Sequence, residues 1–410
     1  MKDADTIVLP RLTSTEVDVE DPWGEGHDVA PQPATAPVRW RVAAWLVPAL
    51  LTVTLCLLRA GAPAWSDDPP AWGIAGSPLM RWWAEVLGTP GPAVRVVSMV
   101  AVTAAAALVG LLAARLFTPR VGLLAGVIFA LLPTSTRYAQ EVQPYALTVF
   151  AAVLATFLLV LAVDRPTFGR FAGYGAAVLL LGLSHGLALL LLAGHGWTVF
   201  AFRRGVAGRW SAVALLGALP AAVALGLSGG QPGAPIARGP NLTPDVLAAT
   251  PRELFGVTAL GIVLLVLALF SLPLRRSAAI YTAWAVVPPL GLLLVAQATP
   301  IWLPEVLLFT LPAWATLGAV ALARVRARWG AVALVAIAVL GAPAQLAGLA
   351  PEGRERAIGD LARIVQLWTR PADGETPHGL ARPPAVDENG RQIKAHGYLR
   401  NTHPLSGLPE

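Results

Sequence analysis

Long apolar runs without a single Asp, Glu, Lys or Arg recur along most of the chain. A helix needs about 20 apolar residues to cross the hydrocarbon core of a bilayer, and the runs are of this length. The runs cover residues 42–58, 96–114, 142–163, 171–202, 254–274 and 329–351. We predict an all-α polytopic membrane protein with about eleven transmembrane helices. The predicted spans are roughly 42–59, 93–114, 121–135, 144–163, 171–183, 186–202, 210–228, 254–274, 277–297, 305–323 and 329–349.

The run from Phe171 to Phe202 decides the topology. At about 1.5 Å per residue it is too long for one upright helix and too short for two full spans. Two short helices keep the flanking arginines on one face, whereas one continuous helix moves three arginine clusters to the opposite face, against the positive-inside bias. We therefore predict a break near Ser184-His185-Gly186 and a cytoplasmic N-terminus. The arginines assigned to the cytoplasm are Arg39, Arg41, Arg115, Arg120, Arg165, Arg170, Arg203, Arg204, Arg209, Arg275, Arg276, Arg324, Arg326 and Arg328.

The two ends of the chain differ from the apolar region, residues 39–350. Residues 1–38 are polar and Pro-rich and lack the layout of a signal peptide, which predicts a disordered cytoplasmic tail. Residues 351–370 are predicted to form an amphipathic helix. Its apolar positions at helical spacing are Ile358, Leu361, Val365 and Trp368. Residues 371–410, with prolines among polar residues, are predicted to be a flexible extracytoplasmic tail.

Composition excludes several classes of protein. Hydrophobic residues make up 56% and charged residues 13% of the 410 residues, whereas soluble domains carry roughly a quarter charged residues. The net charge of +6 comes from arginines scattered between apolar runs, which favours membrane topology over nucleic-acid binding. Cys56 is the single cysteine, so no disulfide framework forms. Heavy use of Ala, Gly, Pro and Arg is typical of a high-GC bacterial genome.

The predicted outer loop 60–92 carries an acidic pair, Asp67 and Asp68, between Trp65 and Trp72. A carboxylate near a low-dielectric boundary has a raised pKa and can act as the general base for an acceptor hydroxyl. The alternative is a solvated acidic loop, because an outer loop is where acids cost least.

Three other segments combine polar side chains with apolar surroundings. Residues 136–150 hold a polar interhelical turn, which is either part of a site or a capped turn with interfacial tyrosines. His185 lies at a predicted outer turn and is a candidate site contact, whereas His195 lies within its span; the pair has no third ligand nearby, so we predict no metal site. Glu305 opens the tenth span. The candidate substrate-binding residues here are Arg137, Tyr138, Glu141, Gln143, Tyr145, His185 and Glu305.

Together these segments resemble the GT-C membrane glycosyltransferases, especially the bacterial branch related to protein O-mannosyltransferases and aminoarabinose transferases. The resemblance covers roughly residues 40–350. Trp65-Ser66-Asp67-Asp68 is similar to the acidic motif of the family's first outer loop. The turn from Thr136 to Leu147, TRYAQEVQPYAL, is its most specific stretch, and residues 185–195 and 304–314 are similar to two later motifs.

The resemblance implies a GT-C-like bundle with an outer-face first loop. It implies transfer of a mannose- or arabinose-like sugar from a polyprenyl-phosphate donor to an acceptor hydroxyl, with inversion, at the extracytoplasmic face of the bacterial inner membrane. Asp67 matches the catalytic acid, with Asp68 assisting or exchanging roles with it. Arg81 joins the candidate substrate-binding residues. Gln143 and Glu305 stand where the family has arginines, and Arg81, Arg95 and Arg137 are candidates to compensate.

The implied partners are the polyprenyl-phosphate sugar, an envelope glycan, lipid or protein acceptor, and membrane lipids, without nucleic acid. No cofactor is implied beyond the lipid-linked donor, and a need for a divalent cation stays open. The main alternative is a catalytically inactive relative that binds lipid-linked sugars during envelope assembly, favoured by Gln143, Glu305 and the short segment of eight residues from Pro69 to Gly76. A carrier for such lipids would need ionisable residues at mid-membrane, and the charge-free runs offer almost none.

Overall fold

The structure is a computed structural model that describes residues 37–58, 77, 79, 92–140, 144–229, 242–271, 276–298, 302 and 304–346. All of them belong to the first of two units into which the chain divides, residues 1–364. The second unit, residues 365–410, lies outside the described residues. So do the predicted amphipathic helix at 351–370 and the predicted tails, except that residues 37 and 38 are described and helix α1 begins at Val38.

The described part of the chain is helical throughout. Its elements are α1 (Val38–Leu58), α4 (Pro92–Leu116), α5 (Pro119–Leu131), α6 (Pro133–Tyr138), α7 (Tyr145–Asp164), α8 (Phe168–Ser184), η1 (Gly186–Leu190), α9 (Leu191–Phe202), η2 (Arg204–Val206), α10 (Ala207–Gly229), α11 (Pro244–Phe255), α12 (Thr258–Phe270), α13 (Arg276–Ala298), η3 (Pro304–Thr310), α14 (Leu311–Arg324) and α15 (Ala327–Leu346). The elements labelled η are 3-10 helices. The predicted all-α class is confirmed.

Seven of these helices are long and apolar enough to cross a membrane, or eight if the bent pair α11 and α12 counts as one span. Three further apolar segments are shorter: α5, α8, and η1 with α9. Each of the predicted spans therefore has a helical counterpart, and the short ones include the pair expected within residues 171–202. The protein is a multi-pass membrane protein.

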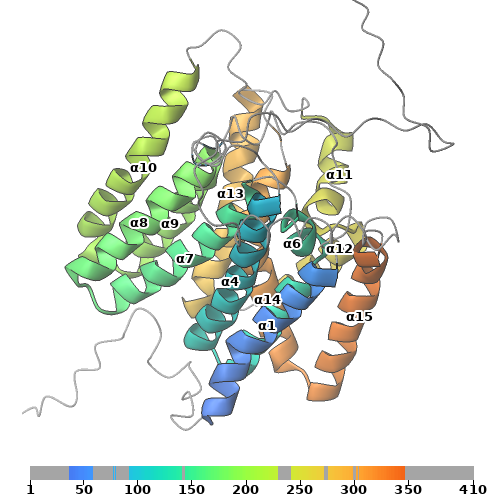
Figure 1. Ribbon diagram of the computed structural model, residues 1–410. Coiled ribbons are helices and arrows are strands. Elements are labelled where there is room, and N and C mark those ends of the chain that lie inside the picture. The colour runs from blue at the N-terminus through green and yellow to red at the C-terminus, as the bar shows by residue number, and fades with distance from the viewer. Residues whose placement is uncertain are drawn as a thin grey trace, which may run out of the picture. The chain divides into compact units, whose positions relative to one another are not determined.

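Helix α14 and the preceding η3 occupy the centre of the bundle. Their apolar window is 89% buried, against 17% for α15 and 22% for α1. Figure 1 shows α7, α8, α9 and α10 on one side of this centre and α12 with α15 on the other. The peripheral helices expose large apolar side chains such as Leu215 and Val335, as expected for surfaces that face lipid.

Small residues allow α1, α4 and α5 to pack closely. A Cβ on Gly110 would collide with the backbone carbonyl of Ala44, and one on Gly126 would collide with the ring of Pro48. Lipid tails are as apolar as Leu side chains, so association of membrane helices depends on such close van der Waals contact. The crossings of α1 therefore require glycine at these positions.

The predicted break within residues 171–202 is confirmed. Helix α8 ends at Ser184, His185 has an extended backbone conformation, and η1 starts at Gly186. The predicted span 254–274 corresponds to α12, whereas the segment before it, predicted as an outer loop, holds α11, and α11 and α12 meet at an 84° bend. Gly256 in the bend has a φ of 81°, and a Cβ there would also lie 2.8 Å from Pro133, so the bend needs glycine for both reasons.

We expect Gly110→Ala to lower the stability of the folded protein by about 1–3 kcal/mol, the cost of overpacking a tight site. The added methyl meets backbone rather than a mobile side chain, so α1 must move. Thermal unfolding in detergent measures the change. Gly169→Ala in α8 is the control, because nothing lies within 4 Å of its added methyl; equal unfolding temperatures for the two variants would contradict the close α1–α4 crossing.

Candidate functional site

Several interruptions of helices meet at one end of the bundle, which we call the Tyr145 end. They are the turn between α6 and α7, the break between α8 and η1, the bend between α11 and α12, and the 3-10 helix η3. Helix η3 packs against α7, α11 and η1, and α6 packs against α11. Side chains from segments far apart in the sequence therefore converge at this end.

A row of aromatic rings lies at the Tyr145 end. The rings of Tyr138 and Tyr145 meet edge to face with centroids 5.3 Å apart, and the rings of Tyr145 and His185 stack with centroids 6.0 Å apart. The guanidinium of Arg137 lies 5.3 Å from the centre of the Tyr138 ring, within cation–π range. The row combines flat apolar surfaces, hydroxyl groups and one cation, which is the chemistry that binds a sugar phosphate.

Two carboxylates accompany this row. Glu253 near the end of α11 experiences the like charge of Glu305 on η3 and the opposite charges of Arg137 and Arg252. Within the described part of the chain, Glu305 Oε2 and His185 Nδ1 are buried without a hydrogen-bond partner, as is the indole N–H of Trp314 on α14. A buried polar atom left unpaired costs about 1–3 kcal/mol, and such atoms call for an explanation such as a ligand.

Burial lowers the pKa of His185 from its ordinary value of 6.5 to about 4. Desolvation disfavours the imidazolium, because the ring loses water and gains no compensating anion. His185 is therefore neutral near pH 7. A neutral imidazole can donate or accept one hydrogen bond at Nδ1, so it suits a hydroxyl group better than it suits a phosphate.

The chain on both sides of the first predicted outer loop is fixed to the Tyr145 end. The side-chain amide of Gln140 donates to the carbonyl of Cys56, near the end of α1, over 2.9 Å. The hydroxyl of Ser77 donates to the carbonyl of Leu183, beside the α8–η1 break, over 3.2 Å. Residue 58 and residue 77 therefore both lie at this end.

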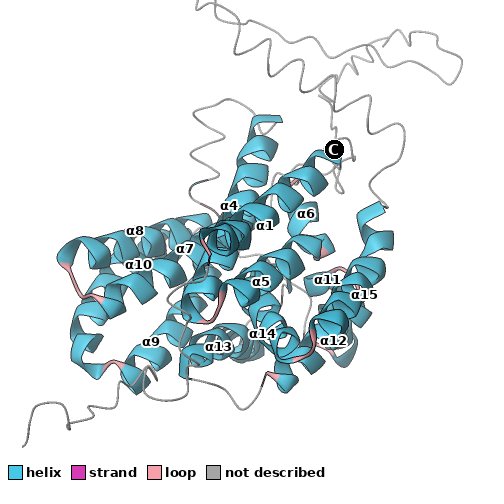
Figure 2. Ribbon diagram, turned by 90° about the horizontal axis from the view of Figure 1, so that it is seen from below, coloured by secondary structure: helices cyan, strands magenta, loops and turns pink. Residues whose placement is uncertain are grey.

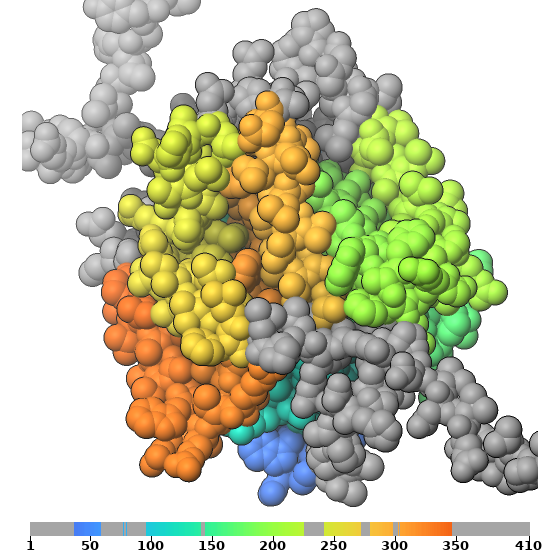
Figure 3. All heavy atoms as spheres, turned by 180° about the vertical axis from the view of Figure 1, so that it is seen from behind, coloured from blue at the N-terminus to red at the C-terminus, as the bar shows by residue number. Residues whose placement is uncertain are grey.

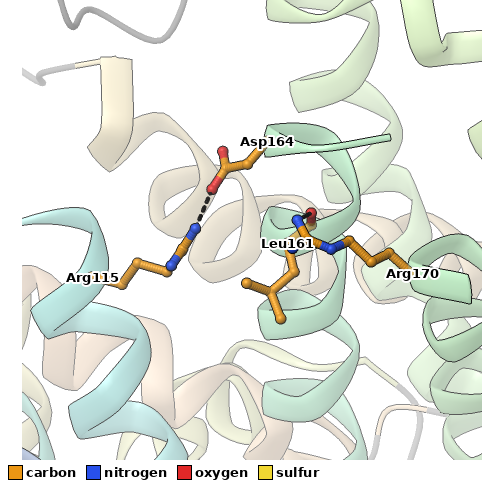
Figure 4. Close-up of polar contacts among 4 residues, drawn as sticks. All are labelled: Arg115, Leu161, Asp164 and Arg170. Carbon is orange, nitrogen blue, oxygen red and sulfur yellow. Dashed lines mark hydrogen bonds and ion pairs between the residues drawn. The ribbon is translucent and has the colours of Figure 1, made fainter. Parts of the chain in front are cut away.

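The opposite end of the bundle, which we call the basic end, has a different character. Figure 4 shows Arg115 paired with Asp164 at 2.7 Å and Arg170 donating to the carbonyl of Leu161. The Arg115 and Asp164 side chains are 44% and 36% exposed, and exposed ion pairs contribute about 0–1 kcal/mol. The arginines here are bound to helix ends and to an exposed acid, so we assign no site to this end.

The structure brings together five of the predicted site residues: Arg137, Tyr138, Tyr145, His185 and Glu305. The remaining five lie outside the described residues: Asp67, Asp68, Arg81, Glu141 and Gln143. The predicted contrast between the two histidines agrees with the structure, because His195 lies deep in the bundle with partners on both ring nitrogens. Among the described residues, no three His, Cys, Asp or Glu side chains group as metal ligands.

Sequence reasoning missed Glu253 as a residue of this end. Glu253 was assigned to a connecting loop, whereas it lies on α11 and reaches the site only because the chain bends at Gly256. The one available signal was the PRELFG sequence at the bend, where an acid stands three residues before a glycine in an apolar region.

A comparison with protein families supports the resemblance drawn from the motifs. Residues 69–225 match the family model of dolichyl-phosphate-mannose-protein mannosyltransferases. This match covers less than half of the chain, and over this stretch the chain is similar to a family of GT-C glycosyltransferases. A membrane glycosyltransferase is the class that this match supports. The match includes the turn at Arg137 and His185 and stops before Glu253. No curated protein matches the chain.

Two solved structures of one enzyme are similar to the chain. ArnT from Cupriavidus metallidurans bound to undecaprenyl phosphate has 19% identity and a TM-score of 0.49, with 82% of this chain and 71% of that chain covered. The same enzyme in the apo state has 17% identity and a TM-score of 0.48, with coverage of 81% and 69%. At this level of similarity, residue roles do not transfer from ArnT to this chain.

We expect His185→Gln to reduce the loss of stability on acidification. The pKa of His185 is lower in the folded state than in the unfolded state, so between pH 6.5 and 4 the unfolded state binds more protons. The free energy of unfolding therefore decreases as the pH is lowered through this range. From pH 7 to pH 5 this loss is at most about 2 kcal/mol. Thermal unfolding of both proteins at the two pH values measures it, and identical differences for wild type and variant would contradict the burial of His185.

Proposed function

We propose that the protein transfers a sugar, mannose- or arabinose-like, from a polyprenyl-phosphate donor to an acceptor hydroxyl at the Tyr145 end. The observation that carries the proposal is the convergence there of Arg137, Tyr145, His185 and Glu305, with both flanks of the acidic loop fixed beside them. The family match over residues 69–225 supports the lipid-phosphate donor class.

Asp67 is proposed as the general base. It lies nine residues after Leu58 and ten before Ser77, and both of these flanks are held at the Tyr145 end. The Asp67 carboxylate takes the proton of the acceptor hydroxyl as that oxygen attacks the anomeric carbon. The bond between this carbon and the phosphate oxygen breaks, polyprenyl phosphate leaves with the electron pair, and the configuration inverts. Asp68 assists or exchanges roles with Asp67.

Arg137 is proposed to stabilise the leaving phosphate. A guanidinium offers paired N–H donors to two phosphate oxygens, and charge-assisted hydrogen bonds of this kind are strong. Glu253 and Glu305 repel a phosphate, so they are better suited to accept hydrogen bonds from sugar hydroxyls. Tyr145 and His185 provide the flat surface against which the sugar ring stacks.

The polyprenyl chain is proposed to lie in a hollow of the bundle surface beside α13. Figure 3 shows the surface hollowed between α11 and α13. Both α12 and α13 pack against α14. Both helices expose apolar side chains, which include Leu265 and Leu269 on α12 and Leu290 and Leu294 on α13. An isoprenoid chain there keeps its apolar surface away from water while its phosphate reaches the Tyr145 end.

The Tyr145 end is proposed to face the outside of a bacterial inner membrane. The arginines of the basic end then face the cytoplasm, as the positive-inside bias requires. This orientation puts the N-terminus in the cytoplasm and the C-terminus outside. The acceptor is then an envelope glycan, lipid or protein on the outer face.

We expect Asp67→Asn to abolish transfer while donor binding is retained, because the amide cannot take the proton from the acceptor. The effect of removing a general base is about 10²–10⁴-fold on the rate. Transfer of radiolabelled sugar from polyprenyl-phosphate donors by protein in lipid vesicles measures it, with Asp68→Asn in parallel. Asp164→Asn at the basic end is the control and retains full activity.

If the wild type transfers no sugar from any donor tested and still binds polyprenyl phosphate, this result would contradict the transfer reaction. It would support the second candidate function, an inactive protein that binds lipid-linked sugars. Glu305 is the observation that favours this second candidate, because it stands where the resembled family has an arginine. Wild-type activity in Asp67→Asn and Asp68→Asn alike would remove both acids from the mechanism.

We expect Arg137→Gln to weaken binding of undecaprenyl phosphate by roughly 10- to 100-fold, the loss of one charge-assisted hydrogen-bonded contact. Binding to purified protein in detergent is measured by titration of the lipid against intrinsic tryptophan fluorescence. Arg115→Gln removes an arginine at the basic end and leaves the affinity unchanged. Equal losses in both variants would indicate a non-specific charge effect.

A further inference from the structure

At the α8–η1 break the polypeptide passes from one helix layer, formed by α7, α8 and α10, to a second layer, formed by α9 and α13. Helix α8 packs against α7 and α10, whereas α9 packs mainly against α13. Figure 2 shows α7, α8 and α10 together, with α9 turned toward α13. Tyr174 lies eleven residues before His185 and His195 ten residues after it. At equal rise per residue, the two side chains stand at about the same height on the diverging helices.

A buried chain of hydrogen bonds connects the layers at this height. The indole N–H of Trp210 donates to the oxygen of Tyr174 over 2.9 Å, and the Tyr174 oxygen lies 3.2 Å from His195 Nδ1. His195 Nε2 lies 3.0 Å from Thr156 Oγ1, which donates to the carbonyl of Ala152 over 2.8 Å. The residues come from four helices, α10, α8, α9 and α7.

Only one direction of donation satisfies every member of this chain. Thr156 gives its hydrogen to Ala152, so it accepts from His195 Nε2–H. His195 Nδ1 is then an acceptor for the hydroxyl of Tyr174, whose oxygen accepts from Trp210. The imidazole is neutral with its hydrogen on Nε2. Four helices thus share one ordered polar connection in a region without water to replace a lost partner.

Close packing prevents the members of this chain from shifting. A Cβ on Gly196 would lie 2.8 Å from the Trp210 ring, and one on Gly194 would lie 3.1 Å from the carbonyl of Ala283 on α13. Helix α9 is therefore held against α10 and α13 by direct contact on either side of His195. The hydrogen bonds from Trp210 to Thr156 and the contacts at the two glycines together fix the angle between α8 and α9.

Each layer carries part of the candidate site. Tyr145 is the first residue of α7, and His185 stacks on it at the end of α8. In the other layer, the indole N–H of Trp284 on α13 donates to the carbonyl of Phe309 in η3 over 2.9 Å, and η3 carries Glu305. Because η3 also packs directly against α7 and η1, the angle between the layers contributes to the separation of the aromatic row from Glu305 together with these contacts.

We propose that His195 is a positioning residue, because the hydrogen-bonded chain from Trp210 to Thr156 holds the layer with Tyr145 and His185 at a fixed distance from the layer with Glu305. The inference deepens the proposed function: the site is set from the interior of the membrane domain, far from the reacting atoms. Misplacement of a reacting group by about 1 Å can cost 10²-fold in rate, so the expected effect falls on turnover.

The test compares Tyr174→Phe, His195→Leu and His195→Gln with the wild type. Tyr174→Phe deletes a single hydroxyl, and the amide of His195→Gln can still accept from Tyr174 and donate to Thr156. We expect kcat to fall at least tenfold in Tyr174→Phe and His195→Leu, the affinity for undecaprenyl phosphate to stay within threefold, and His195→Gln to restore most of kcat. The matched control is Thr198→Val, which removes a buried hydroxyl of α9 bonded to Gly194 outside the chain.

A loss of kcat in Thr198→Val as large as in Tyr174→Phe, or an unchanged kcat in Tyr174→Phe, would overturn the proposal. A second readout needs no activity. Hydrogen–deuterium exchange in peptides covering residues 184–190 and 304–310 rises in His195→Leu and not in Thr198→Val if the chain holds both segments. Unchanged exchange of both segments in His195→Leu would overturn the positioning role, whether or not the wild type transfers sugar. Raised exchange in His195→Leu combined with an inactive wild type would reject only the transfer reaction.

Discussion

A bilayer offers no water to a backbone amide or to a buried hydroxyl, and the rest of the structure depends on this constraint. The described chain is helical because a helix satisfies its own backbone. Several hydroxyls inside the bundle follow the same rule: Thr52, Thr148 and Thr316 each donate to the carbonyl four residues earlier. An imidazole or an indole does not form this hydrogen bond within its own helix, so its hydrogen-bond partners come from neighbouring helices.

The same constraint explains where the site lies. The unpaired buried atoms of His185 and Glu305 lie where helices are interrupted, and the breaks at Pro133, His185 and Gly256 occur at one end of the bundle. The basic end has short connections instead, with arginines bound to helix ends and to Asp164. The bundle is therefore asymmetric: one end carries arginines bound to helix ends and to Asp164, and the other collects aromatic, acidic and basic groups around Tyr145.

This asymmetry is suited to a substrate that is half lipid and half sugar phosphate. The apolar chain of such a substrate belongs beside helices that face lipid, and its polar head belongs at an interrupted end. The similarity to a GT-C family over residues 69–225 and the site chemistry agree on this division. In the proposed function, the acids Glu253 and Glu305 near Arg137 accept hydrogen bonds from hydroxyl groups next to the phosphate.

Local pattern alone determined the helices, the break at Ser184-His185-Gly186 and the candidate role of the turn at Arg137, because hydropathy, arginine placement and proline or glycine act over a few residues. Asp67 and Asp68 were found the same way and rest on the sequence and on their anchored flanks. Tertiary structure decided the rest. The stacking of Tyr145 on His185, the approach of Glu253 and the partners of His195 join residues tens of positions apart. The bend of 84° at Gly256 and the angle between α8 and α9 arise from packing between helices. The spacing of apolar residues in the sequence therefore does not predict them.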